Sequence, residues 1–249
     1  MKKFCTAAAT LSTLLLASLT VFAQTQSRED VLKEIKKKHA ELAVLEKSFL
    51  EPAEEDRVRY SEFLRQSDTG IIRLLPREKF DSETYKDQRK SIVMRGGGAY
   101  YSFTRLTHEY GFGSDIELEQ GFFKVGFAGA DYGFLTDLGD VPIETVSADT
   151  HAVSIFGAYQ AAREEPLARR EYRKVADGTD LEGIPIKSRL PVRSNSTYLL
   201  RSINYRESDV LVAFKVVRMD SDGSATIVWK LLKKYGQPEL NRPEPIGIG

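Results

Sequence analysis

The stretch that decides the fold is residues 197–232, TYLLRSINYRESDVLVAFKVVRMDSDGSATIVWKLL in one-letter code. Three runs rich in β-branched and aromatic residues are separated by short polar segments, which is the pattern of an antiparallel meander. The middle run, residues 210–217, is apolar on both faces except for Lys215. Because a strand buried on both faces reads as a continuous apolar run, we expect the middle run to be the central strand.

The segment between the second and third runs has two interpretations. Asp222 followed by Gly223 is a strong hairpin signal, because glycine adopts the positive φ that such turns require. Asp220 and Asp222 before Gly223 also match part of a calcium-binding loop. Such a loop ends in a glutamate, which is absent here because the residues after Gly223 read as a strand. We therefore favour the hairpin.

The N-terminus has the pattern of a secretory signal peptide. Lys2 and Lys3 precede an uncharged apolar stretch that ends at a small residue, Ala23, where we expect cleavage. Cys5, the only cysteine, lies in this segment, so the mature chain is predicted to form no disulfide, thiolate nucleophile or cysteine metal site. An exported chain without disulfides favours a bacterial envelope protein. We predict a periplasmic or extracellular location.

Charge and hydropathy indicate which partners to expect. The chain has 36 basic and 36 acidic residues, and loss of residues 1–23 removes only Lys2 and Lys3 from this balance. A nearly neutral protein has no electrostatic reason to bind nucleic acid or an anionic membrane. No later stretch is long and apolar enough to span a bilayer as a helix. The expected partner is therefore an envelope protein or a glycan, with no nucleic acid and no integral membrane span after cleavage.

The mature chain is expected to begin with helices. Ser27 and Asp30 match a capping box, and apolar residues recur at helical spacing from Val31 to Phe49. A run of three lysines at 36–38 would also suit a membrane surface or a partner, but packing of this helix on its own domain is the favoured interpretation. Pro52 ends the helix and suits the first turn of a second one, which predicts an αα-hairpin.

The predicted domain organisation has four parts. Residues 1–23 form the signal peptide, 24–68 the helical segment, 69–235 a β-rich domain and 236–249 an extended tail. The predicted fold class is α+β: the helical segment packs on a mostly antiparallel β body, a sandwich or half-barrel, that ends in the three-stranded meander. Within this body we expect a helix at 166–176, between Pro166 and Gly178, and an edge strand at 184–192 because of its prolines.

Residues 99–139 combine many aromatic residues with many glycines. We expect strands at 99–106, 115–127 and 131–138, and the favoured interpretation is that the rings fill the core. The alternative is a carbohydrate-binding module in which exposed rings of the 99–134 segment stack on sugars from one concave face. The candidate ligand-binding residues are Tyr100, Tyr101, Arg105, His108, Tyr110 and Tyr132.

Catalytic chemistry has few candidates. His108 and His151 with Asp115 or Asp149 would suit zinc, which leaves a metal-dependent hydrolase as a further alternative. Nothing in their spacing requires that these residues meet.

Other catalytic motifs are weaker still. Glu117 and Glu119 share a strand face and would suit glycosidase acid–base work, but two solvated carboxylates are the favoured interpretation. Ser114 is not followed by the glycine of a nucleophile elbow, and the glycines at 96–98 are not followed by the lysine of a phosphate loop. We assign no catalytic residue, metal or cofactor. The prediction is an exported non-catalytic binding or scaffolding protein of the cell envelope.

Overall fold

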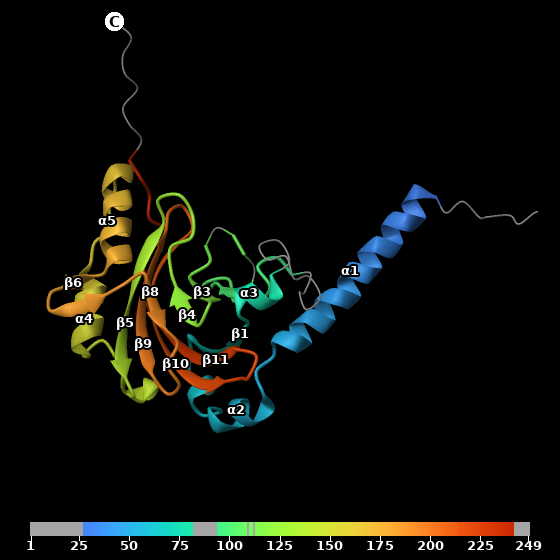
Figure 1. The fold of residues 1–249 in the computed structure, drawn as a ribbon, viewed down its shortest axis with the longest axis horizontal. Helices are drawn as coiled ribbons and strands as arrows, with labels where there is room; N and C mark the ends of the chain where they lie inside the picture. The colour runs from blue at the N-terminus through green and yellow to red at the C-terminus, as the bar shows by residue number, and fades with distance from the viewer. Residues whose placement is uncertain (1–26, 82–93, 109, 112, 242–249) are drawn as a thin grey trace, which may run out of the picture. The chain divides into compact units, whose positions relative to one another are not determined.

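The structure is a computed structural model that describes residues 27–81, 94–108, 110–111 and 113–241 (Figure 1). The predicted signal peptide and residues 242–249 of the predicted tail lie outside the described residues. The chain divides into two units, residues 1–41 and 42–249. Within the described ranges, none of the helices combines the length and the apolar character that crossing a membrane requires.

The first helix, α1 (Arg28–Leu50), begins at the predicted cap. The backbone N–H of Asp30 donates to Ser27 Oγ at 3.1 Å, and the Ser27 hydroxyl donates to the Asp30 carboxylate at 2.7 Å. Two short helical segments follow beyond Pro52, α2 (Glu54–Arg59) and the 3-10 turn η1 (Phe63–Arg65). The C-terminal end of α1 belongs to the second unit, where Leu50 packs in the core.

A five-stranded antiparallel sheet forms the centre of the second unit. Its strands, in spatial order, are β1 (Thr69–Leu74), β11 (Ala225–Lys234), β10 (Ser208–Met219), β9 (Thr197–Asn204) and β5 (Tyr132–Gly139). The predicted meander is confirmed, and its middle run lies in β10, the central strand. The long apolar run predicted this central place correctly because both faces of β10 are covered.

The turn between β10 and β11 is a hairpin. Gly223 has φ +87°, and its N–H donates to the Asp220 carbonyl at 2.9 Å. The guanidinium of Arg73 lies 2.9 Å from the Asp220 carboxylate and 3.4 Å from that of Asp222. The carboxylates that suggested a calcium loop are thus paired with an arginine, and the hairpin prediction is confirmed.

A smaller antiparallel sheet faces the first. Its strands are β2 (Tyr100–Tyr101), β3 (Ile116–Glu119), β4 (Phe122–Lys124) and β8 (Arg189–Pro191), in that order. The predicted strand at 99–106 is reduced to β2. The predicted single strand at 115–127 is wrong, because Gln120 at φ +51° and Gly121 at φ +74° turn the chain back and make β3 and β4 a hairpin.

The two sheets and a helical layer are held by apolar contacts. One face of the large sheet packs on the small sheet; Phe123 of β4, for example, contacts Tyr198 and Phe214. The other face is covered by α4 (His151–Ala158), α5 (Glu165–Asp177) and the hairpin β6 (Thr179–Leu181) with β7 (Ile184–Ile186). Figure 1 shows α4 and α5 on one side of the sheet and β3 and β4 on the other.

The later predictions are largely confirmed. Helix α5 includes Pro166 in its first turn and ends before Gly178, as expected for 166–176. The predicted edge strand at 184–192 becomes two short strands, β7 and β8, and β8 does lie at a sheet edge. Two further short elements, α3 (Arg77–Phe80) and η3 (Ile143–Thr145), complete the described fold.

Candidate functional site

A pocket of about 540 Å³ lies between the small sheet and α5. Its side chains come from both regular elements and loops. They include Arg77 of α3, Tyr100 of β2, Glu117 of β3, Lys124 of β4, Arg189 of β8, Tyr172 of α5, and Tyr110 and Phe127 of loops. Segments more than a hundred residues apart in sequence, from Arg77 to Arg189, are therefore needed to build it.

Aromatic rings form much of the pocket wall. The Tyr100 ring makes edge contacts with Tyr110 and Phe127, at centroid distances of 4.7 and 5.3 Å. Tyr100 is only 1% exposed, whereas Tyr172 is 42% exposed. Tyr110 and Phe127 are half-buried. Tyr100 is thus the floor of the pocket, and Tyr172 belongs to its rim.

The polar groups of the floor satisfy one another. The Tyr100 hydroxyl donates to Glu117 Oε1 at 2.6 Å, and Arg77 Nη1 donates to the same oxygen at 3.0 Å. Arg77 Nε donates to Asp81 at 3.1 Å. Burial raises the pKa of Tyr100, and its bond to Glu117 raises it further. The tyrosine therefore remains a neutral donor to a carboxylate that a guanidinium also holds.

The cations nearer the rim differ in their partners. Lys124 forms an ion pair with Glu119. Arg189 is exposed, lies 4.8 Å from the centroid of the Phe122 ring, and forms no ion pair with any residue that the structure describes. Arg189 is therefore the cation of this pocket that a negatively charged ligand meets without displacing a carboxylate.

The two glutamates of β3, and Asp115 just before it, are buried, which corrects the expectation that Glu117 and Glu119 are solvated. Asp115, Glu117 and Glu119 are 0%, 3% and 8% exposed. The alternating pattern suggested an open face, but β3 lies between β2 and β4, and Arg77 and Lys124 cover the two glutamates. Both members of the proposed glycosidase pair are therefore bound by cations.

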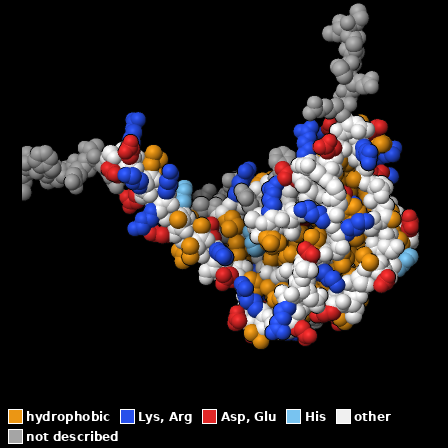
Figure 2. Space-filling model, turned by 180° about the vertical axis from the view of Figure 1, so that it is seen from behind, with side chains coloured by type: hydrophobic (Ala, Val, Ile, Leu, Met, Phe, Trp, Pro, Cys, Tyr) orange, Lys and Arg blue, Asp and Glu red, His pale blue; other side chains and the backbone are white. Residues whose placement is uncertain are grey.

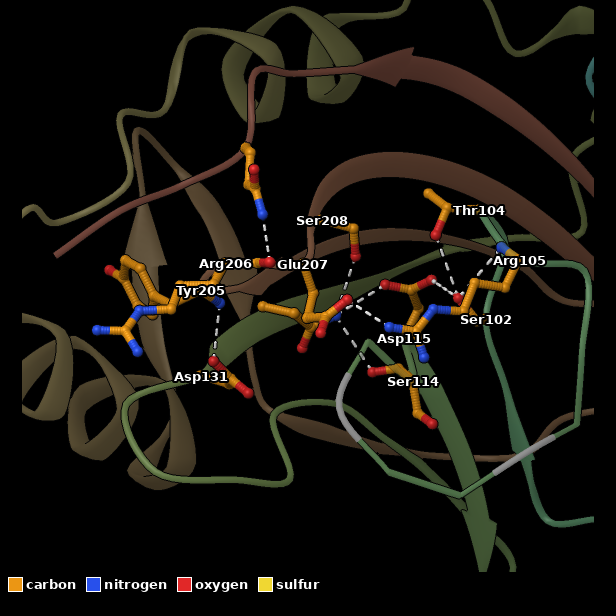
Figure 3. Close-up of polar contacts among 12 residues, drawn as sticks. Ser102, Thr104, Arg105, Ser114, Asp115, Asp131, Tyr205, Arg206, Glu207 and Ser208 are labelled. Atoms are coloured by element: carbon orange, nitrogen blue, oxygen red, sulfur yellow. Dashed lines mark hydrogen bonds and ion pairs between the residues drawn. The ribbon is translucent and has the colours of Figure 1, made fainter.

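Asp115 is part of a separate buried network (Figure 3). Its Oδ2 accepts from the Phe103 N–H at 2.8 Å, and its Oδ1 accepts from Asn204 Nδ2 at 3.0 Å. Burial raises its pKa to about 6, and hydrogen bonds from Ser202 and from the Phe103 backbone oppose that rise.

Arg105, a candidate ligand residue, lies outside the pocket and pairs with Glu207 (Figure 3).

Three other candidates also lie outside the lining of the pocket. Tyr101 is buried, burial raises its pKa to about 12, and its ring lies 5.0 Å from the ring of His108. His108 Nε2 is 2.9 Å from the Arg73 carbonyl oxygen, and burial lowers its pKa despite that bond. Tyr132 is buried beside Tyr159, their hydroxyl oxygens 3.0 Å apart.

The favoured interpretation that the rings fill the core holds for Tyr100, Tyr101 and Tyr132, and the alternative of exposed rings is wrong for these three. Of the six candidates, only Tyr100 and Tyr110 line the pocket together. The metal hypothesis also loses support: His151 is exposed at the start of α4, and the described ranges contain no group of three or more His, Cys, Asp and Glu side chains able to hold a metal ion. The zinc hydrolase has no site among these residues.

Sequence reasoning did not single out Tyr172 or Arg189 as ligand residues. Tyr172 is an aromatic residue among the charged residues of α5, but it lies four residues after Ala168 and three before Val175, which is the spacing of the buried face. Its spacing therefore gave no signal of an exposed ligand residue, and Arg189 had none either. Figure 2 shows basic, acidic and hydrophobic side chains interspersed on one face of the molecule, with no single basic patch on that face.

Comparisons of the whole chain with known proteins found no match. No protein-family model, no curated protein and no solved structure matches the chain.

Proposed function

We propose that the protein is an exported, non-catalytic binding protein of the cell envelope, and that the pocket between the small sheet and α5 holds its ligand. The observation that carries this proposal is the division of roles within the pocket. Its floor is charge-balanced, while Tyr172 and Arg189 at its edge are exposed. Binding pockets characteristically combine aromatic walls with a few well-placed polar groups.

The state of the carboxylates supports binding over catalysis. A general acid or base must be able to exchange a proton with a substrate. Glu117 accepts hydrogen bonds from Tyr100 and Arg77, and Glu119 pairs with Lys124. Both groups are suited to fixing the shape of the pocket. Export is supported by the signal-peptide pattern of residues 1–23.

A glycan is the ligand class that the rim favours among envelope partners. Sugars present flat apolar faces, and Tyr110 and Tyr172 both have ring surface accessible at the pocket. We therefore assign the proposed stacking on sugars to Tyr110 and Tyr172 and not to the buried tyrosines. An envelope protein that inserts a side chain into the pocket is the competing partner.

The test is thermal unfolding of residues 24–249 against neutral sugars, acidic sugars, envelope glycans and divalent metals. A ligand that binds only the folded state stabilises it by about 2.7 kcal/mol at a hundred times its Kd. For a ligand that stabilises the protein in this screen, we expect Tyr172→Ala and Arg189→Gln each to lower the affinity by about tenfold, a loss of ~1.4 kcal/mol.

Leu167→Ala is the matched control, because Leu167 is an exposed apolar residue of the same helix that does not line the pocket. If a ligand binds the wild type, Tyr172→Ala and Arg189→Gln with the same affinity, it binds elsewhere and the assignment of the site is wrong.

A further inference from the structure

We propose that the ligand is an extended anionic glycan, a chain of carboxylated sugars, which lies along α5 from the pocket toward Arg206. The inference rests on the proposed function, since it begins in the same pocket. It adds the length, the charge and the direction of the ligand.

The hollows beside α5 adjoin one another. A second hollow of about 350 Å³ shares Phe127 and Tyr172 with the pocket. A third, of about 860 Å³, shares Arg169 and Arg173 with the second and extends to Arg206. The three hollows therefore form one track. Four α5 residues on it, Glu165, Arg169, Tyr172 and Ala176, follow one another at spacings of three or four and so lie on one side of the helix, as a chain lying along that helix requires.

The lining of the three hollows has an excess of positive charge. The three hollows are lined by six basic side chains and three acidic ones. Arg173, Arg189 and Arg206 are exposed, and none forms an ion pair within the described part of the chain. Arg169 pairs with Glu165 at 2.6 Å, but both groups are about half exposed, where such pairs contribute little. Three arginines at intervals along the track favour a ligand that repeats its negative charge.

The arginines and aromatic rings of the track also indicate which repeating unit the ligand has. Arginine presents a planar fork that matches a carboxylate with two parallel hydrogen bonds. Phe127 and Tyr172 line both of the first two hollows, so the ligand must also offer a flat face at that junction. Polyphosphate has charge without such faces. Single-stranded nucleic acid has both, but its binding stacks successive bases on aromatic side chains, and no aromatic side chain lines the third hollow. A carboxylated sugar chain satisfies both requirements.

The experiment is isothermal titration of residues 24–249 with oligogalacturonates of increasing length, at low and high salt. We expect affinity to rise with length until the track is filled, and to fall as salt is added. Arg173→Gln and Arg206→Gln should each weaken the longest oligomer by about tenfold, equivalent to ~1.4 kcal/mol, and leave the disaccharide unchanged. Arg189→Gln should weaken both.

Arg170→Gln is the matched control. It removes the same charge from the same exposed helix, but Arg170 lines none of the three hollows. Neutral oligosaccharides of equal length, polyphosphate and single-stranded DNA complete the titrations.

The outcomes separate the two proposals. If the disaccharide binds as tightly as the longest oligomer, or if Arg170→Gln weakens binding as much as Arg173→Gln, the pocket stands and the track is wrong. If only a neutral sugar, polyphosphate or DNA binds, in a manner sensitive to Tyr172→Ala, the site stands and the ligand class is wrong. If no probe depends on Tyr172 or Arg189, both proposals fall.

Discussion

Asp115 illustrates how a single residue depends on its surroundings. It was a candidate zinc ligand with His108 and His151, yet it is fully buried between segments that bring Phe103, Asn204 and three serines around it. A buried carboxylate is tolerated when its oxygens accept hydrogen bonds, but removal from water still favours its neutral form. The network therefore has a consequence for stability that the sequence pattern does not reveal.

The stability of the folded protein should depend on pH through Asp115. The folded-state pKa of Asp115, about 6, is above its ordinary value of 3.8. The folded protein therefore binds the proton more tightly, and the stabilisation is full below pH 3.8 and is lost as the pH rises through about 6. Between pH 7 and pH 5, Asp115 should add about 1 kcal/mol to the free energy of unfolding. Asp115→Asn should remove that increment, measured by urea unfolding at both pH values.

The comparison with the variant isolates Asp115 from other groups. Burial also raises the pKa of Asp131 to about 6, which acts with the same sign. Burial lowers the pKa of His108, which acts with the opposite sign because acid then favours the unfolded chain. Both contributions remain in Asp115→Asn. An unchanged difference between pH 5 and pH 7 would show that Asp115 does not titrate as described.

At the scale of elements, local sequence and local structure agree most closely in the β10–β11 hairpin and in α5. Each is defined by residues with strong backbone preferences: Gly223 with φ +87° in the turn, and Pro166 and Gly178 at the two ends of the helix. These preferences act within a few residues, so no distant contact is needed to select the structure.

Gly223→Ala should therefore destabilise the protein by about 1 kcal/mol, because an alanine is strained at this positive φ. A Cβ at Gly223 meets only ordinary contacts, the nearest at 3.6 Å from Pro76, so crowding adds little. The measurement is the free energy of unfolding in urea.

Gly236→Ala serves as the reference, since a Cβ there meets nothing within 4 Å and no positive φ opposes it. It should lie within a few tenths of a kcal/mol of the wild type. Equal effects of the two substitutions would contradict the assignment of strain to the turn.

At the scale of the whole molecule, stability without covalent crosslinks rests on packing. The two sheets share one apolar cluster, and α4 and α5 close another on the opposite face of the large sheet. A chain of this size buries enough apolar surface to fold without disulfides. The only cysteine, Cys5, belongs to the segment that we expect to be removed on export.

We expect protein recovered from a bacterial periplasm to lack the signal peptide and therefore Cys5. Mass spectrometry should show an N-terminus at Gln24, because the signal peptide is expected to end at Ala23. The melting temperature should be the same with and without a reductant, since the mature chain contains no thiol to oxidise. An intact Met1 in the periplasmic fraction, or a reductant-dependent melting temperature, would contradict this prediction.

The sequence by itself determined the meander, the central place of β10, the capped start of α1 and the limits of α5, because each depends on periodicity or on backbone preferences of adjacent residues. Only the tertiary structure decided which tyrosines are buried, that β3 and β4 are separate strands, and that Arg77, Glu117, Tyr172 and Arg189 surround one pocket. Those outcomes depend on contacts between segments far apart in the chain, such as Arg77 with Glu117. Residue pattern shows that a face is apolar or charged, but which segment covers that face is settled by the packing of the whole.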